Sequence, residues 1–117
     1  MNRIIKFRCW DKELSKIYPV KTIYWKDEDF EVVLYDETHR IKEDIEIMQY
    51  TGLKDKNGKE IYEGDILKSV DGKISVIEYE APHFIVRHKP ENGSDFIAVK
   101  NYFEIIGNIY ENPELLK

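Results

Sequence analysis

Apolar and polar residues alternate in short runs along most of this chain, which is the pattern of β-strands with one buried face. In residues 3–10, Ile5, Phe7 and Cys9 fall on one face, and basic or aromatic residues fall on the other. Further runs predict strands over residues 16–20, 22–25, 30–35, 45–51, 66–70, 73–79, 84–88, 96–99 and 101–110. Residues 36–44 fit the pattern poorly, and either one helical turn capped by Asp36 or a solvated loop accounts for them.

Turns that contain glycine separate these runs. Asn57-Gly58 predicts a type I′ turn, because Gly has no side chain and Asn tolerates left-handed backbone angles. Asp71-Gly72 joins two β-rich runs and is the strongest hairpin signal in the chain. A kink is expected at Gly64, so Gly58, Gly64 and Gly72 are all predicted to be structural turn positions.

Two prolines and one glycine mark special backbone positions. Pro19 cannot donate to a strand ladder, so its strand is expected to lie at a sheet edge or to end there. Gly107 suggests a bulge in the closing strand. Asn112-Pro113 predicts a short terminal helical turn, with Asn as the N-cap and Pro at the first helical position.

Strands at spacings of about ten residues, with turn residues between them, predict a mostly β fold with a small barrel. The length of 117 residues fits a single domain, residues 1–117. Within it, we expect an N-terminal β-rich subregion over about residues 1–45 and the barrel over about residues 46–117.

Charge is distributed unevenly along the chain. The net charge is −5, yet residues 1–26 hold seven Lys or Arg against two acidic residues, and residues 27–117 hold eleven against twenty-one. An acidic bulk disfavours non-specific nucleic-acid binding, which needs a basic surface to displace counterions. The basic segment either forms a local patch or pairs with the acidic remainder.

A cytoplasmic protein with no membrane partner is expected. No apolar run approaches the roughly 18–20 residues of a membrane span. The start, Met1–Arg8, breaks its apolar residues with charge, unlike a signal peptide.

The sequence predicts no catalytic, cofactor-binding or metal-ligating set. The single cysteine, Cys9, excludes an intramolecular disulfide, and its apolar neighbours predict a buried, inert thiol. His83 and His88 lie at odd separation on one predicted strand, so they point to opposite faces and are interpreted as surface histidines. Glu63 and Asp65 either converge as an acid/base pair or line a solvated kink, and no partner base is visible.

Aromatic and basic residues interleave in the first part of the chain, at Lys6, Phe7, Arg8, Trp10, Lys12, Tyr24, Trp25 and Lys26. This is the pattern of a stacking platform with phosphate contacts, as small barrels use on single-stranded nucleic acids. A sheet with one core face and a charged rim gives the same pattern. The candidate nucleic-acid contacts are Lys6, Arg8, Trp10, Lys12 and Lys26.

Three stretches resemble the signatures of the YopX family of phage and prophage proteins. They are Arg8-Cys-Trp-Asp11, Gln49–Ile66 and Ile105–Leu116, and they follow one another in the expected order. Cys9 stands where a small residue such as Ala is usual. The resemblance implies a small cytoplasmic protein encoded by a phage or an integrated prophage, with a β-rich fold and an SH3-like barrel. It implies no activity, because the family has no established catalytic or binding residues to carry over.

These observations predict a non-enzymatic accessory protein that works as a β-rich interaction module. Its partner is expected to be an unknown protein or further copies of itself in a homo-oligomer, and no cofactor is expected. The alternative is a nucleic-acid-binding small β-barrel that uses the basic, aromatic N-terminal patch.

Overall fold

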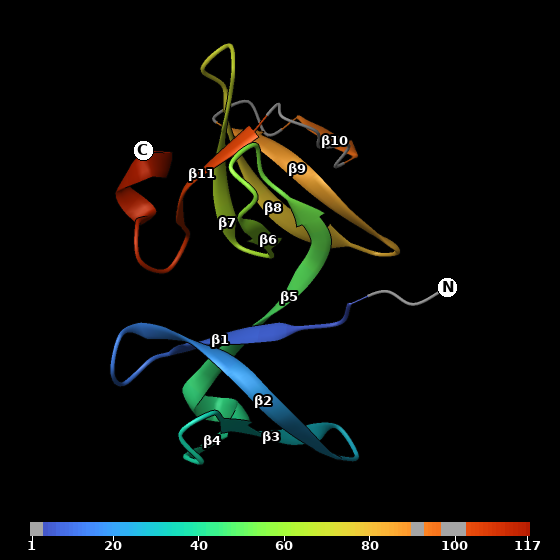
Figure 1. Ribbon diagram of the computed structural model, residues 1–117, viewed down its shortest axis with the longest axis vertical. Helices are drawn as coiled ribbons and strands as arrows, with labels where there is room; N and C mark the ends of the chain where they lie inside the picture. Colours follow the sequence, from blue (N-terminus) through green and yellow to red (C-terminus); the bar gives the residue numbers. More distant parts are fainter. Residues whose placement is uncertain (1–3, 90–92, 97–102) are drawn as a thin grey trace. The chain divides into compact units, whose positions relative to one another are not determined.

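The alternating runs fold into antiparallel sheets in the computed structural model of the chain, which describes residues 4–89, 93–96 and 103–117 (Figure 1). The mostly β expectation is confirmed. Contacts between residues divide the chain into two units. We call Ile5–Gln49 the N-terminal unit and the part from Tyr50 to Lys117 the C-terminal unit.

The N-terminal unit is one antiparallel sheet with the strand order β4-β3-β2-β1-β5. Its elements are β1 (Phe7–Asp11), β2 (Lys16–Lys26), β3 (Asp29–Leu34), β4 (His39–Ile41), the 3-10 helix η1 (Lys42–Asp44) and the first half of β5 (Ile45–Lys54).

One face of this sheet carries the core of the N-terminal unit. Cys9, Val32, Leu34 and Ile45 are buried there and pack together. Each fully buried aliphatic side chain of this kind contributes about 1.5–3 kcal/mol to folding. Half-buried side chains pack around them, namely Tyr18, Val20, Ile23, Phe30 and Ile47. The predicted faces of the strands near residues 3–10 and 30–35 are therefore correct at Cys9, Val32 and Leu34.

β2 is one strand of eleven residues rather than two short ones. It pairs with β1 from Lys16 to Pro19 and with β3 from Val20 onward, and the register shifts between Val20 and Thr22. The expectation that Pro19 marks a sheet edge or a strand end is therefore wrong. Because the β3 pairing begins at Val20, Pro19 has a paired neighbour on one side only, where its missing N–H costs at most one ladder hydrogen bond.

Residues 36–44 are neither a helical turn capped by Asp36 nor a loop throughout. The Asp36 carboxylate accepts hydrogen bonds from the Thr38 N–H at 3.0 Å and from its hydroxyl at 2.6 Å, which closes a tight turn after β3. The short strand β4 follows and pairs with β3, with Ile41 opposite Glu31. Three strand residues followed at once by η1 are too few to show an alternating pattern.

The C-terminal unit contains a second antiparallel sheet, with the strand order β10-β9-β8-β7-β11. Its elements are β6 (Glu60–Tyr62), β7 (Asp65–Ser69), β8 (Ile74–Glu80), β9 (His83–Lys89), β10 (Ser94–Phe96), β11 (Phe103–Asn108) and the 3-10 helix η2 (Pro113–Leu116). The second half of β5 pairs with β6. A buried core cluster of this unit contains Ile61, Leu67, Ile77, Val86 and Phe103.

The strand pairings of the described residues form open sheets and close no barrel. β10 pairs with β9, and β11 pairs with β7, so no pairing within residues 4–89, 93–96 and 103–117 joins the two ends of the second sheet. Alternation along the sequence specifies strands and faces, whereas closure depends on strand tilt and shear. The SH3-like likeness stays a prediction. The predicted strands over 96–99 and 101–110 lie partly outside the described residues.

Gly58 is the left-handed position of the β5–β6 turn, with φ +81°. The expected type I′ turn is wrong, because of the pair Asn57-Gly58 only the glycine has a positive φ. The Gly58 N–H donates to the Asp55 carbonyl oxygen at 3.0 Å, and the Asp55 N–H donates to the Lys59 carbonyl oxygen at 2.8 Å. The loop therefore has three residues, and the glycine follows a type I turn.

Two other hairpins repeat this turn. Between β7 and β8, Gly72 has φ +89°, and its N–H donates to the Ser69 carbonyl oxygen at 3.0 Å. Between β3 and β4, the Glu37 N–H donates to the Leu34 carbonyl oxygen at 3.0 Å. Glu37 has φ +69° and stands where the other two turns have glycine, so this turn carries backbone strain.

Gly64, with φ +83°, joins β6 to β7. Its N–H donates to the Ile77 carbonyl oxygen at 2.8 Å, and its carbonyl oxygen accepts from the Ile109 N–H at 2.9 Å. The neighbouring Asp65 is buried, and its Oδ2 accepts from the Tyr62 N–H at 2.8 Å. The interpretation of this segment as a solvated kink is therefore wrong at Asp65, which closes a turn inside the unit.

The buried carboxylate of Asp55 connects the β5–β6 turn to β11. Its Oδ1 accepts from the N–H groups of Asn57 and Lys59, both at 2.9 Å, and its Oδ2 accepts from the Ile105 N–H at 3.0 Å. Burial alone would raise the pKa of Asp55, but these three backbone hydrogen bonds hold it below its usual value.

The end of the chain follows the sequence expectations in part. β11 is bulged between Ile105 and Gly107, as predicted. A Cβ on Gly107 would lie 2.5 Å from Oδ1 of Asn112, so only glycine fits there. Asn112 precedes Pro113 at the start of η2, but its side chain accepts from the Asn108 N–H at 3.2 Å instead of capping η2. Within the part of the chain that is described, no helix has the length and apolar character needed to cross a membrane.

Candidate interaction groove

A groove lies in the N-terminal unit at the end of the β2–β3 hairpin. It has a volume of about 490 Å³ and is open to solvent. We call it the aromatic groove. It is lined by Tyr24, Trp25, Lys26, Asp29, Phe30, Glu31, Ile41 and Glu43.

Strand register sorts these side chains into two sets. In the β2–β3 hairpin, Tyr24 lies opposite Glu31, and β4 places Ile41 opposite Glu31, so these three share one face of the sheet. Trp25 lies opposite Phe30, and because neighbouring strand residues face opposite sides, this pair lies on the other face. The alternation of β-prone residues in β2 and β3 fixes this arrangement, because a shift of one residue would turn each side chain to the other face.

The groove exposes large aromatic side chains. Trp25 is 66% exposed, Tyr24 59% and Ile41 51%. The rings of Trp25 and Phe30 lie 5.3 Å apart between centroids at 52°, which is a favourable tilted contact. Trp25 is therefore held in place by a neighbouring ring while most of its own surface faces solvent.

Carboxylates outnumber ammonium groups around the groove. A second hollow of about 600 Å³ shares Lys26, Asp29 and Glu43 with it and adds Asp27, Glu28 and Lys42. The two hollows together are lined by five carboxylates and two lysines, namely Asp27, Glu28, Asp29, Glu31 and Glu43 with Lys26 and Lys42. The surroundings are therefore negatively charged.

The predicted nucleic-acid contacts fall into two places. Arg8 and Trp10 share one face of β1, with Lys6 before the strand and Lys12 after it. Lys26 lies apart from them at the far end of β2, beside the aromatic groove. The structure thus places two of the five candidates on β1 and two at its ends, and it separates the fifth.

Arg8 and Lys12 contact other groups of the N-terminal unit. The Arg8 Nε donates to the Met48 sulfur at 3.4 Å. The Lys12 ammonium lies 3.4 Å from the Glu46 carboxylate and donates to the Glu43 carbonyl oxygen at 3.2 Å. Pairing of the basic segment with acidic residues, one of the two readings of the charge distribution, therefore occurs at Lys12.

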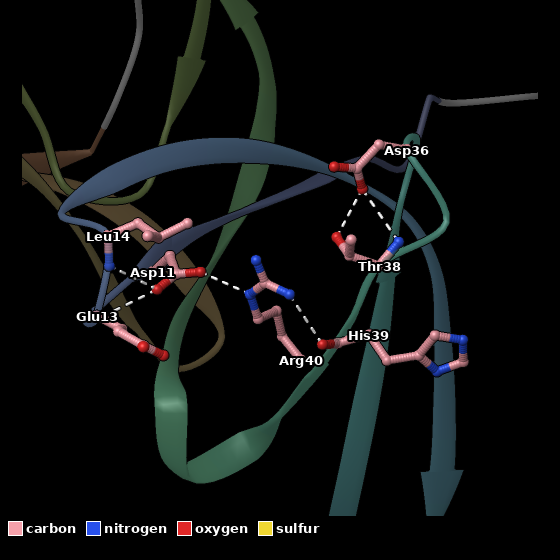
Figure 2. A network of polar contacts seen from close by, with 7 residues as sticks. All are labelled: Asp11, Glu13, Leu14, Asp36, Thr38, His39 and Arg40. Atoms are coloured by element: carbon pink, nitrogen blue, oxygen red, sulfur yellow. Dashed lines mark hydrogen bonds and ion pairs between the residues drawn. The ribbon is translucent and has the colours of Figure 1, made fainter.

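Asp11 and Arg40 form an ion pair inside the N-terminal unit (Figure 2). The Arg40 Nε donates to Oδ2 of Asp11 at 2.6 Å, and Oδ1 accepts from the N–H groups of Glu13 at 2.9 Å and Leu14 at 3.0 Å. Burial alone would raise the pKa of Asp11, but the hydrogen bonds from Arg40, Leu14 and Glu13 hold it below its usual value. The same pair raises the pKa of Arg40, so both groups stay charged and fix β4 against the β1–β2 turn.

Groups with catalytic potential are enclosed. Burial raises the pKa of the Cys9 thiol to about 11, and the nearby Asp11 carboxylate adds to the rise, so the thiolate is scarce at neutral pH. The prediction of a buried thiol is confirmed. Within the described residues, no group of three or more His, Cys, Asp or Glu is placed to hold a metal ion.

A serine–histidine contact joins β8 to β9. The Ser75 hydroxyl and Nδ1 of His88 lie 2.9 Å apart, an arrangement that the sequence did not predict. Ser75 is fully buried, so a substrate cannot reach its hydroxyl as a nucleophile. The interpretation of His88 as a simple surface histidine is wrong, because its ring is half-buried and bonded to Ser75.

The sequence did not predict the aromatic groove as a site. Tyr24 and Trp25 belong to the interleaved aromatic and basic residues, which suggested a platform for nucleic-acid bases rather than a groove, and Phe30 belongs to a predicted strand. Ile41 lies in residues 36–44, for which the sequence allowed either a helical turn or a loop. The available signal was the adjacent pair Tyr24-Trp25, because two neighbouring strand residues face opposite sides of a sheet and at least one of them is then exposed.

Two solved structures resemble the chain over nearly its whole length. Protein EF1440 from Enterococcus faecalis is 27% identical, with a TM-score of 0.65, and the match covers 99% of this chain and 100% of that one. The YopX protein from Bacillus subtilis is 22% identical, with a TM-score of 0.66, and the match covers 96% of this chain and 98% of that one. This second likeness shows a shared fold. No curated protein matches the chain by sequence.

The sequence model of the family described as YopX protein matches residues 6–117. The match runs from the start of β1 through η2 and includes all three stretches that resemble the family signatures. On this match, the chain belongs to the YopX protein family.

Proposed function

We propose that this chain is a phage- or prophage-encoded accessory protein that acts in the host cytoplasm as a non-enzymatic protein-interaction module. Membership of the YopX family supports the phage origin, through the resemblance described above. The observation that carries the interaction role is the aromatic groove, where Tyr24 and Trp25 each leave more than half of their surface exposed.

Exposed Tyr and Trp side chains are effective anchors at protein interfaces. They supply a large contact area with few rotatable bonds, so little conformational entropy is lost when a partner binds. Trp25 loses less conformational entropy on binding than an unsupported side chain would, because its ring already packs against Phe30. The groove is also open rather than enclosed, which suits a partner surface better than a small substrate that must be shielded from water.

A tagged pull-down from prophage-induced cells tests this role, with nuclease-treated extract and three forms of the chain. The forms are the wild type, Trp25→Ala and a matched control, Tyr79→Ala. Tyr79 is 52% exposed, and its ring lies 5.2 Å from that of Phe84 on the β8–β9 hairpin, so it copies the environment of Trp25 in the other unit.

We expect a protein partner that survives nuclease treatment, is lost with Trp25→Ala and is kept with Tyr79→Ala. If the partner is a further copy of the chain, sedimentation of the purified wild type should show an oligomer. Trp25→Ala should then sediment as a monomer. If all three forms capture the same proteins in equal amounts, the groove has no part in partner binding and the proposal fails.

The alternative function is nucleic-acid binding through Lys6, Arg8, Trp10, Lys12 and Lys26. The shared face of Arg8 and Trp10 on β1 favours it, because alternate strand positions suit a base-stacking aromatic flanked by phosphate contacts. The ion pair of Lys12 with Glu46 weakens it.

This alternative predicts salt-sensitive binding of single strands that is lost when Lys6, Arg8 and Trp10 are substituted together. Absence of binding even at low salt would exclude it. Lys26, which lies away from β1, is expected to contribute little, so Lys26→Gln serves as the internal control.

A further inference from the structure

We infer that the aromatic groove binds a basic peptide segment of the partner protein, with an arginine side chain lying against the ring of Trp25 and pairing with the carboxylates around the groove. The inference rests on the proposed interaction role and names the chemistry of its partner. It assigns the groove to a cationic ligand rather than to the anionic one that the basic start of the sequence suggests.

The first argument is the exposed aromatic surface. A guanidinium group is planar and weakly hydrated, and it stacks on the electron-rich face of Trp or Tyr. Trp25 is 66% exposed and is braced on one side by Phe30, so its remaining surface is accessible in a defined orientation. The exposed Ile41 adds an apolar surface for the aliphatic part of a long basic side chain.

The second argument is the charge around the groove. Asp29 accepts a hydrogen bond from the Phe30 N–H, and Glu31 contacts His39. The side-chain carboxylates of Asp27, Glu28 and Glu43 form no hydrogen bond or ion pair with any residue that the structure describes.

One of the two lysines, Lys42, already donates a hydrogen bond to the backbone. The negative charge of the surplus carboxylates is therefore not neutralised by it. The Lys42 ammonium donates to the Glu28 carbonyl oxygen at 3.1 Å, so it binds the hairpin backbone rather than a carboxylate. An anionic ligand would meet three carboxylates in the aromatic groove and two more in the hollow that shares residues with it, and would be repelled. A cationic ligand would instead pair with the carboxylates that have no partner. Charge complementarity therefore selects a basic partner.

A direct binding experiment tests the inference with synthetic probes at physiological ionic strength. Fluorescein-labelled hexa-arginine is titrated with the full chain and followed by anisotropy, beside hexa-lysine, a Gly-Ser peptide of equal length and an oligo-dT strand. Hexa-arginine is expected to bind more tightly than hexa-lysine, because only guanidinium stacks on the Trp25 ring, and the Gly-Ser peptide and oligo-dT are expected not to bind.

The aromatic contribution is measured with Trp25→Ala against Tyr79→Ala. Trp25→Ala is expected to weaken hexa-arginine binding about tenfold, equivalent to about 1.4 kcal/mol. Tyr79→Ala, with its comparable exposure in the other unit, is expected to leave the affinity unchanged. The location is read from the indole N–H signals in NMR spectra, because the chain has two tryptophans and the Trp25 signal should shift while that of Trp10 does not.

The charge contribution is measured with a double variant, Glu28→Gln with Glu43→Gln. It is expected to weaken hexa-arginine binding about tenfold, equivalent to about 1.4 kcal/mol. The matched control is Glu13→Gln with Glu114→Gln, which removes the same charge from two exposed positions that do not line the groove. The control should bind as the wild type does.

Three outcomes would overturn the inference. They are no hexa-arginine binding, binding that Trp25→Ala leaves unchanged, and oligo-dT binding that Trp25→Ala abolishes. If the pull-down partner depends on Trp25 while hexa-arginine fails to bind, the interaction role stands and the basic ligand is refuted. If hexa-arginine binds through Trp25 but the cell extract yields no Trp25-dependent partner, the ligand chemistry stands and the proposed cellular role is refuted.

Discussion

Replacing Asp11 by Asn is expected to destabilise the N-terminal unit strongly. The substitution keeps the size of the side chain and one carbonyl oxygen, but it removes the charge that faces Arg40. The change therefore isolates the electrostatic part of the contact in Figure 2 from its packing.

The structure sets the magnitude. Asp11 is 1% exposed, and its Oδ2 lies 2.6 Å from the Arg40 Nε. Removing one partner of a buried ion pair costs about 3–5 kcal/mol, because the other charge is left without compensation. The Arg40 side chain is 24% exposed, so water partly solvates the guanidinium and we expect a loss of about 3 kcal/mol, at the lower end of that range. This is a large share of the 5–15 kcal/mol that stabilises a typical domain.

The assay is urea unfolding followed by tryptophan fluorescence. Both tryptophans, Trp10 and Trp25, lie in the N-terminal unit, so the signal reports on that unit alone. The control is Lys21→Gln, which breaks the exposed ion pair with Glu37 and is expected to leave the midpoint unchanged. If Asp11→Asn and the control unfold at the same urea concentration as the wild type, the ion pair does not stabilise the unit and the reasoning fails.

The same pair predicts a pH dependence. The pKa of Asp11 is lower in the folded chain than in the unfolded one, so its ionised form stabilises the fold fully above the unfolded pKa of about 3.9. That stability is lost as the pH falls through the lower, folded pKa. The difference in free energy of unfolding between wild type and Asp11→Asn should therefore be constant near neutral pH and shrink below about pH 4. A difference that grows on acidification would contradict this sign.

Four further predictions concern turns and buried groups. Gly58→Val and Gly72→Val should each lower the free energy of unfolding of the C-terminal unit by about 1–2 kcal/mol, because a β-branched residue is strained at φ +81° and +89°. Glu37→Gly, at φ +69°, should instead raise that of the N-terminal unit by up to about 1 kcal/mol. Asp55→Asn should lower the free energy of unfolding of the C-terminal unit by about 2–3 kcal/mol, because three backbone N–H groups that donate to the Asp55 carboxylate lose a charged acceptor. The Cys9 thiol should resist Ellman's reagent in the folded chain at mildly alkaline pH and react once urea unfolds the chain.

Circular dichroism in urea measures the stability changes, and absorbance measures the thiol reaction. Apart from the neighbouring residues in the chain, no atom lies within 4 Å of a Cβ added to Gly58 or Gly72, so we attribute the expected loss to backbone strain. Unchanged midpoints in both valine variants would refute it. Loss of stability in Glu37→Gly would mean that its contact with Lys21 outweighs the strain. Rapid labelling of folded Cys9 would show that the thiol is accessible.

The sequence predicted most strands correctly because alternation along a strand directly reflects which face is buried. It could not predict the type of the Asn57-Gly58 turn. A type I′ turn and a type I turn followed by a left-handed glycine favour the same residue pair, and they differ by one position in the register. Here the side chain of Asp55 decides, because its Oδ1 accepts from both Asn57 and Lys59 and so fixes the three-residue loop.

Long-range contacts explain the other differences. Ile41 carries no local signal for its strand, because β4 is held by its pairing with β3 and by the Arg40–Asp11 ion pair twenty-nine residues away. The aromatic groove needs three paired strands, so the sequence places Tyr24 and Trp25 in an aromatic and basic pattern but does not show that they line a groove. The residue pattern within one strand does not show which strands pair beside it.

The contact between Asp55 and β11 bears on the order of folding. It joins residues fifty positions apart, and closing a flexible loop of that length costs about 3.5 kcal/mol of chain entropy. The β7–β8 and β8–β9 hairpins close over short turns and should form first. Until β11 arrives, one edge of β7 has no strand beside it, and an open edge of this kind can pair with another chain. The buried carboxylate of Asp55 holds β11, which covers that edge of β7, so we expect Asp55→Asn to make the folding chain more prone to aggregation.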